Sequence, residues 1–265
     1  MSSETKQEQT FKNGYAKING INMYYEIHGT GQPLLMIHGG GSTMTTSFGT
    51  LIPFLSKSRQ LITVDMQAHG RTSDRDTPLS FQQGADDVAE LLKQLNIGKA
   101  DILGFSNGGQ AAMEVAIRHP EKVRKLVLLS IFYKRSGTPP QFWEFMKNSS
   151  FEQLPQVYKD EFLKVNNNPQ ALMNMYNRDV ERMQNFKDWS DEALESIKAP
   201  SLIVMGDQDV ATVEHAVEMH RLIQGSRLLI MPGNHGGYFG EAMSWQENSK
   251  MPGAFINVLE DFLGQ

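Results

Sequence analysis

The sequence GFSNGG at residues 104–109 constrains the fold of this chain more than any other stretch. It follows an apolar run at 99–103 that indicates a buried strand, and it precedes a helical pattern at 110–119 that Pro120 ends. A G-x-S-x-G motif between a strand and a helix predicts a sharp turn that lifts the serine hydroxyl clear of a sheet. Only glycine fits around so tight a turn, and the serine must adopt strained dihedral angles. Ser106 would therefore stand at a helix N-terminus, where backbone amides favour developing negative charge.

Predicted strands alternate with predicted helices along most of the chain. This pattern predicts an α/β fold with a mostly parallel sheet and helices on both faces. Two alternating runs at 11–17 and 21–28 flank Asn19-Gly20 and indicate an antiparallel hairpin at the sheet edge. Further strands are predicted at 33–38, 60–65, 99–103, 123–129, 201–205 and 226–230, and helices at 47–58, 81–95, 110–119, 213–223 and about 246–262.

One long stretch, from about 135 to 196, breaks the alternation. It contains no predicted strand, it is rich in methionine and aromatic residues, and it lies between two strands of the sheet. Right-handed crossovers would bring the carboxyl ends of the parallel strands to one rim, where ligands bind. We therefore expect a single domain spanning 1–265 with a helical lid inserted over that rim. Most of the apolar lid residues should pack against the body, and the others should line an adaptable cavity.

Composition and charge exclude several classes of function. The net charge of −5 argues against a nucleic-acid-binding surface, and the absence of cysteine excludes disulfides, zinc–thiolate sites and a cysteine nucleophile. No cluster of histidine and carboxylate residues at ligand spacing indicates a metal, and no cofactor motif appears. Residues 1–10 are polar and lack the apolar core of a signal peptide, and no apolar run is long enough to span a membrane. These features predict a cytoplasmic protein that acts on a small molecule.

A serine nucleophile requires a base, and the base requires an orienting carboxylate. Among seven histidines, His235 directly follows the last predicted strand, in the glycine-rich loop 231–237, and is the best candidate base. Asp207 and Asp209 both follow the strand at 201–205, and both could reach that histidine. The order serine, aspartate, histidine along the chain is typical of one class of catalytic triad.

Acyl chemistry also requires hydrogen-bond donors for the tetrahedral oxyanion. The amide that follows the nucleophile, that of Asn107, is the first candidate. The second should come from the loop HGGG at 38–41, where glycines allow the backbone amides to turn inward. Gly40 is the preferred residue in that loop, and Gly41 is the next.

These motifs together resemble the α/β-hydrolase superfamily. The resemblance rests on HGGG at 38–41, DMQAHGRTS at 65–73, GFSNGG at 104–109, GDQD at 206–209 and GNH at 233–235. It implies an eight-stranded sheet whose second strand is antiparallel, with a cap after the sixth strand. In the family's G-x-x-D pattern the acid is the last residue, which favours Asp209 over Asp207. The small residue at Gly40, where many relatives carry a bulkier one, implies extra room beside the oxyanion site.

The resemblance also separates subclasses. Ser106 distinguishes the chain from epoxide hydrolases and haloalkane dehalogenases, which carry aspartate at that position. The chain is more similar to carboxylesterases, enol-lactonases, C–C-bond hydrolases and cofactor-free haloperoxidases. This implies hydrolysis of an ester, thioester or lactone with a small to medium apolar group. The alternatives are C–C cleavage of a diketone or peracid formation by the same triad, and a ligand-binding protein like the hormone receptors that resemble this family.

Candidate substrate-binding residues come from the rim loops and the predicted lid. Lys134, Arg135 and Arg178 are candidates for binding an anionic substrate, although each is expected to be a solvated surface charge. The predicted lining residues are Gly41, Phe105, Phe132, Trp143, Met146, Met175 and Tyr238.

Overall fold

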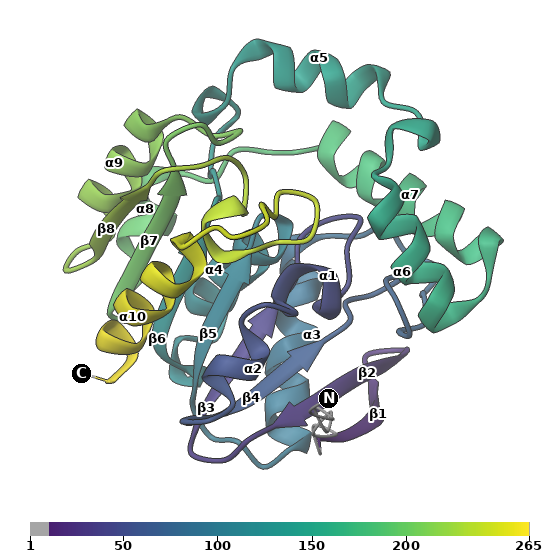
Figure 1. Ribbon diagram of the computed structural model, residues 1–265, viewed down its shortest axis with the longest axis horizontal. Coiled ribbons are helices and arrows are strands. Elements are labelled where there is room, and N and C mark those ends of the chain that lie inside the picture. The colour runs from purple at the N-terminus through teal and green to yellow at the C-terminus, as the bar shows by residue number, and fades with distance from the viewer. Residues whose placement is uncertain (1–10, 265) are drawn as a thin grey trace, which may run out of the picture.

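The computed structural model describes residues 11–264, and an eight-stranded sheet forms its centre (Figure 1). The strands lie in the order β1-β2-β4-β3-β5-β6-β7-β8. The second strand pairs antiparallel with both of its neighbours, and every pair from β4 to β8 is parallel, as the family resemblance implied. The strands are β1 (Lys12–Ile18), β2 (Ile21–His28), β3 (Gln32–Ile37), β4 (Arg59–Val64), β5 (Ala100–Phe105), β6 (Val123–Leu129), β7 (Ser201–Gly206) and β8 (Arg227–Met231).

The sheet is buried on both faces because its central strands are apolar on both faces. In β3, Leu35 and Ile37 belong to one core cluster, whereas Leu34 and Met36 belong to another, as alternating side chains must. The first cluster packs under α3 (Phe81–Gln94), α4 (Asn107–Arg118) and α9 (Val213–Leu222). The second packs under α1 (Met44–Phe48), α2 (Ile52–Leu55) and α10 (Met251–Gly264), on the opposite face in Figure 1.

The segment between β6 and β7 contains helices and no strand. Its α-helices are α5 (Pro140–Asn148), α6 (Gln156–Asn166), α7 (Pro169–Gln184) and α8 (Asp191–Glu195). Figure 1 shows α5, α6 and α7 beyond the carboxyl ends of the parallel strands. This arrangement puts the segment where ligands of parallel sheets bind, and its movement as a lid stays a prediction.

Two predicted helices differ from the structure. The helix predicted at 47–58 is two short helices, α1 and α2. Thr43 caps the first of them and so starts it early, and Pro53 lies in the first turn of the second, where a missing amide hydrogen costs nothing. The closing helix α10 begins at Met251 rather than near residue 246.

The interpretation of residues 1–10 as a segment without a signal peptide lies outside the described residues. Within 11–264, none of the helices combines the length and the apolar character needed to cross a membrane.

Candidate active site

Ser106 occupies a strained turn between β5 and α4. Its φ and ψ angles are +52° and −126°, a conformation that L-residues adopt only when the surroundings enforce it. The flanking glycines explain how the turn closes: a Cβ atom on Gly104 would overlap the backbone of Gly108, and one on Gly108 would overlap the carbonyl of Ile37. The Ser106 amide donates to the carbonyl of Leu129 at 2.9 Å, which joins the turn to β6.

His235 follows β8 and contacts Asp209, which follows β7. The distance from His235 Nδ1 to Asp209 Oδ1 is 2.6 Å. The other carboxylate oxygen, Oδ2, accepts from Ser130 Oγ at 2.5 Å and from the Gly206 amide at 3.1 Å. Burial by itself would raise the pKa of Asp209, but His235 and these donors hold it below its ordinary value. Asp209 is therefore an anion that binds one ring nitrogen of His235 and leaves Nε2 for other contacts.

Asp207, the competing carboxylate, has a different contact. Its Oδ1 atom accepts a hydrogen bond from the Gly233 amide at 2.8 Å, and the side chain is exposed. Asp207 thus supports the backbone of the loop that carries His235, whereas Asp209 reaches the imidazole.

Within the HGGG stretch at 38–41, after β3, the amides of Gly39 and Gly41 are already engaged. The Gly39 amide donates to Ser47 Oγ at 3.2 Å, and the Gly41 amide donates to Asp179 Oδ2 at 2.5 Å. Within residues 11–264, the amides of Gly40 and Asn107 have no hydrogen-bond partner. The second oxyanion candidate, Gly41, is therefore already engaged, and Gly40 and Asn107 remain available.

The extra room expected beside Gly40 does not exist. A Cβ atom at Gly40 would meet the side-chain amide of Asn107, which occupies that space.

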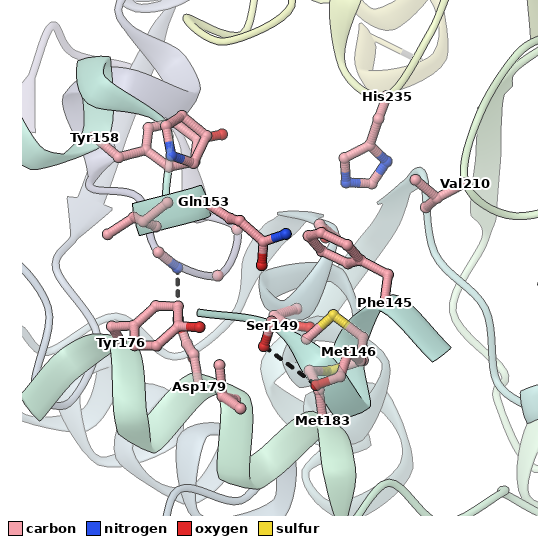
Figure 2. Close-up of a pocket in the computed structure, with 18 of the residues that line it drawn as sticks. Phe145, Met146, Ser149, Gln153, Tyr158, Tyr176, Asp179, Met183, Val210 and His235 are labelled. Atoms are coloured by element: carbon pink, nitrogen blue, oxygen red, sulfur yellow. Dashed lines mark hydrogen bonds between the residues drawn. The ribbon is translucent and has the colours of Figure 1, made fainter. Parts of the chain in front are cut away.

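Ser106 and His235 line one cavity of about 310 Å³, whose wall also includes residues of α5, α6 and α7. Figure 2 shows His235 facing this cavity across from Tyr176 and Asp179 of α7. Four of the predicted substrate-binding residues, Gly41, Phe105, Phe132 and Met146, line it as well. The rest of the wall is Gly39, Gly40, Asn107, Phe142, Phe145, Ser149, Ser150, Gln153, Leu154, Pro155, Tyr158, Tyr176, Asp179, Val180, Met183, Val210 and Met243.

Three predicted lining residues, Trp143, Met175 and Tyr238, lie outside the cavity wall. The Trp143 ring packs against Phe132, with ring centroids 5.7 Å apart, and its indole donates to the Arg135 carbonyl. Met175 is fully buried in a separate small cluster within the inserted helices. Tyr238 is also fully buried, with its hydroxyl 3.0 Å from Ser130 Oγ. The sequence identified the right segments for these three residues but not the direction of their side chains.

A family model described as the alpha/beta hydrolase fold matches residues 32–261. The chain belongs to the α/β-hydrolase family. Among curated relatives, it is 28% identical to a proline iminopeptidase of Saccharolobus solfataricus, over 95% of this chain and 92% of the relative. It is 26% identical to the 2-hydroxy-6-oxo-2,4-heptadienoate hydrolase of Pseudomonas putida, over 92% of this chain and 93% of that hydrolase. These hydrolytic relatives indicate that this α/β hydrolase is an enzyme.

Solved structures show the same fold. The serine hydrolase CarC, involved in carbazole degradation, superposes with a TM-score of 0.78 at 24% identity and covers 96% of this chain and 99% of its own. The enol-lactonase of Burkholderia xenovorans LB400 superposes with a TM-score of 0.73 at 20% identity, over 95% of this chain and 100% of the lactonase chain. At such identities the likeness concerns the fold of this α/β hydrolase and not its substrate.

The most informative wall residues that the sequence interpretation missed lie on one face of α7. Tyr176, Asp179, Val180 and Met183 line the cavity, and their spacing of three, four and seven residues is that of a single helix face. A periodicity analysis of residues 169–184 could have grouped them. The same spacing would also have included Met175, one turn before Asp179, which the structure buries in a cluster within the inserted helices.

Asp179 joins α7 to the loops after β3 and β4. Its Oδ2 atom, which binds the Gly41 amide, also lies 2.8 Å from His69 Nε2, and its Oδ1 accepts from Arg182. Burial would raise the pKa of Asp179, but His69, Arg182 and the Gly41 amide hold it well below its usual range. The carboxylate is thus charged and fully engaged at the edge of the oxyanion loop.

No lysine or arginine is among the described residues that line the cavity of this α/β hydrolase. Lys134 forms an ion pair with Asp191 at 2.6 Å, and Arg178 binds Asp74 at 3.0 Å. Arg135 lies over the ring of Trp143. These three cations have partners elsewhere, so an anionic substrate would find no cation in the wall. The part of the chain described here also contains no group of three metal-ligating side chains.

Proposed function

We propose that this α/β hydrolase is a serine hydrolase that cleaves an ester, thioester or lactone of a small to medium, largely apolar and uncharged substrate. The observation that carries the proposal is the 2.6 Å contact between His235 Nδ1 and Asp209, with Ser106 and His235 in the wall of one cavity. A buried carboxylate on one ring nitrogen of a histidine, in a cavity that also contains a serine, provides the groups that activate a serine nucleophile.

In the proposed reaction, His235 Nε2 accepts the Ser106 proton while the serine oxygen attacks the substrate carbonyl carbon. Asp209 holds the imidazole with its proton on Nδ1 and stabilises the imidazolium that forms. The free amides of Gly40 and Asn107 donate to the oxyanion, at a typical contribution of about 3 kcal/mol for each donor. His235 then protonates the leaving oxygen or sulfur. In the second half, His235 takes a proton from water, the hydroxyl attacks the acyl-enzyme, and Ser106 recovers its proton.

Cleavage of a C–C bond is the second candidate, because two relatives are named as hydrolases of dienoates or dienoic acids. Such substrates carry a carboxylate. The described wall of the cavity has no lysine or arginine, and its one acidic residue, Asp179, is already engaged by Arg182, His69 and the Gly41 amide. A desolvated carboxylate without a cation is costly, and this favours an uncharged ester or lactone. Peracid formation would use the same residues, with hydrogen peroxide in place of water.

The test is a panel of p-nitrophenyl esters of increasing acyl length, hydrolysed by the wild type and by Ser106→Ala. We expect turnover of short to medium acyl groups by the wild type and a loss of kcat on the order of 10⁵–10⁶-fold in Ser106→Ala. A fluorophosphonate should label only the wild type. Labelling that persists in Ser106→Ala would contradict the proposal, as would faster turnover of vinylogous diketo acids than of any ester. Ligand-induced stabilisation without product would instead indicate a binding protein.

A further inference from the structure

The hydroxyl of Tyr176 is buried, lines the cavity, and has no hydrogen-bond partner within the described residues. Its ring is held in place by an edge contact with Phe151, at a centroid distance of 5.6 Å. Figure 2 shows Tyr176 on α7 with its hydroxyl directed across the cavity toward Ser149 and Gln153. Buried polar groups almost always have a partner, because leaving one unpaired costs about 1–3 kcal/mol. An unpaired hydroxyl facing a cavity is therefore a group that awaits a ligand atom.

A second donor faces the same space. The Oε1 atom of Gln153 accepts from the Ser150 amide at 2.8 Å, which fixes the orientation of the side-chain amide. Gln153 is an exposed residue, and its Nε2 group, which has no protein partner among residues 11–264, is directed into the cavity in Figure 2. The neighbouring Ser149 hydroxyl donates to the Met146 carbonyl at 3.2 Å, so it is already occupied.

The electrostatics of the wall define what these donors can bind. Asp179 lies one helical turn from Tyr176 on α7, and it is an anion. Because the wall has no lysine or arginine, a carboxylate or phosphate bound here would pay the cost of desolvation without a cation to compensate it. A neutral oxygen that accepts hydrogen bonds meets both donors without that penalty.

We propose that Tyr176 and Gln153 form a binding subsite for a neutral acceptor oxygen, a ketone, ether or hydroxyl oxygen, on the substrate. This oxygen is separate from the carbonyl that Ser106 attacks, whose donors are the amides of Gly40 and Asn107. The inference rests on the proposed function and narrows the substrate class: an uncharged ester, thioester or lactone that carries a second oxygen function.

The test compares esters that differ only in that oxygen. In one pair the oxygen is in the acyl group: p-nitrophenyl 4-oxopentanoate against p-nitrophenyl 4-methylpentanoate. In the other it is in the alcohol: 3-oxobutyl acetate against 3-methylbutyl acetate, with acid release followed by titration. The wild type should show a lower KM for the oxo ester in at least one pair. In that pair, Tyr176→Phe should raise the KM of the oxo ester about three- to tenfold and leave its methyl counterpart unchanged.

Thermal unfolding of the ligand-free protein separates this role from a structural one. Tyr176→Phe removes an unpaired buried hydroxyl and keeps the ring, so its Tm should equal or exceed that of the wild type. Gln153→Glu is the second variant, because it keeps an oxygen for the Ser150 amide and replaces the donor with a negatively charged acceptor, which would face the substrate oxygen unfavourably. It should also raise the KM of the oxo ester selectively.

Two results would overturn the subsite. One is a wild type that does not prefer the oxo ester in either pair. The other is a Tyr176→Phe variant that slows both members of a pair equally or that unfolds at a lower temperature. Failure of the proposed function looks different: Ser106→Ala would then hydrolyse these esters as well as the wild type does.

Discussion

The carboxylate of Asp179 accepts a hydrogen bond at 2.5 Å from the amide of Gly41, although 138 residues separate the two. One residue comes from a helix of the inserted segment, and the other from the loop that supplies a candidate oxyanion donor. The contact occupies the Gly41 amide and leaves that of Gly40 free. The inserted helices thus contribute to the shape of the candidate active site as well as covering it.

We expect Asp179→Leu to destabilise the protein by about 3–5 kcal/mol, because it leaves the charge of Arg182 buried without its partner. The double variant Asp179→Leu/Arg182→Met removes both charges and should recover most of that loss. Urea unfolding measures both variants. The single variant Arg182→Met completes the cycle, and losses of the two single variants that add up to the loss of the double variant would show that the pair does not couple.

Asp209→Asn should lower kcat by about 10⁴-fold with little change in KM, because an amide cannot hold His235 in the tautomer that accepts a proton at Nε2. Asp207→Asn is the matched control on the same loop. Asp207→Asn should lower kcat less than tenfold, since Asp207 binds only the Gly233 amide. Similar losses in the two variants, measured with a p-nitrophenyl ester, would argue against Asp209 as the partner of His235.

Gly40→Ala should lower kcat by about 10–100-fold, because its methyl group would displace the Asn107 side chain and shift the oxyanion loop. Asn107→Ala keeps the backbone amide and opens the space that the methyl group needs. The double variant should therefore be more active than Gly40→Ala alone. An additive loss of kcat in the double variant would mean that this collision is not the cause.

Acid should destabilise the protein through His38. Burial, with a smaller contribution from His69, lowers the pKa of His38 to about 3, while Asp179 and Arg182 have opposing effects on it. Its Nδ1 lies 2.7 Å from the Gly39 carbonyl, and its Nε2 accepts from the Met66 amide, so the neutral ring is the form that fits.

The sign follows from proton uptake. An unfolded histidine protonates near pH 6.5, so between that pH and about 3 the unfolded chain binds more protons and stability falls as the pH falls. His38 alone would lower the free energy of unfolding by up to about 1.4 kcal/mol for each pH unit of acidification in this range. Urea unfolding from pH 7 to pH 5 should show a shallower decline for His38→Gln than for the wild type. If the unfolding free energies of His38→Gln and of the wild type fall equally with pH, His38 does not contribute to the acid destabilisation.

The central sheet and the elbow were predictable because their signals are local. The hairpin at Asn19-Gly20 forms where two glycine-like conformations are needed, at φ +44° and +90°. The apolar run of β3 indicated a strand buried on both faces, and the glycines around Ser106 indicated the tight turn. Helix ends were less predictable, as α10 shows, because capping and packing compete at the termini.

The cavity was only half predictable. Composition indicated an apolar wall, and Phe105, Phe132 and Met146 lie in it. Met175 and Tyr176 are neighbours in the sequence, yet one is buried between helices and the other faces the cavity. Rotating α7 by about 100° would exchange such neighbours, and only its packing against the body determines that rotation.

The sequence by itself determined the order of strands and helices, the strained turn at Ser106, and the loops that carry the candidate acid and base. Each of these depends on residues close together in the chain, where steric limits and periodicity act directly. The family pattern favoured Asp209, and the tertiary structure shows its contact with His235. Only the tertiary structure decided that Asp179 occupies the Gly41 amide and that Tyr176 faces the cavity unpaired. Those contacts depend on how segments distant in the sequence pack against each other. Moving a loop by one residue, or rotating a helix to another face, would give each side chain different neighbours.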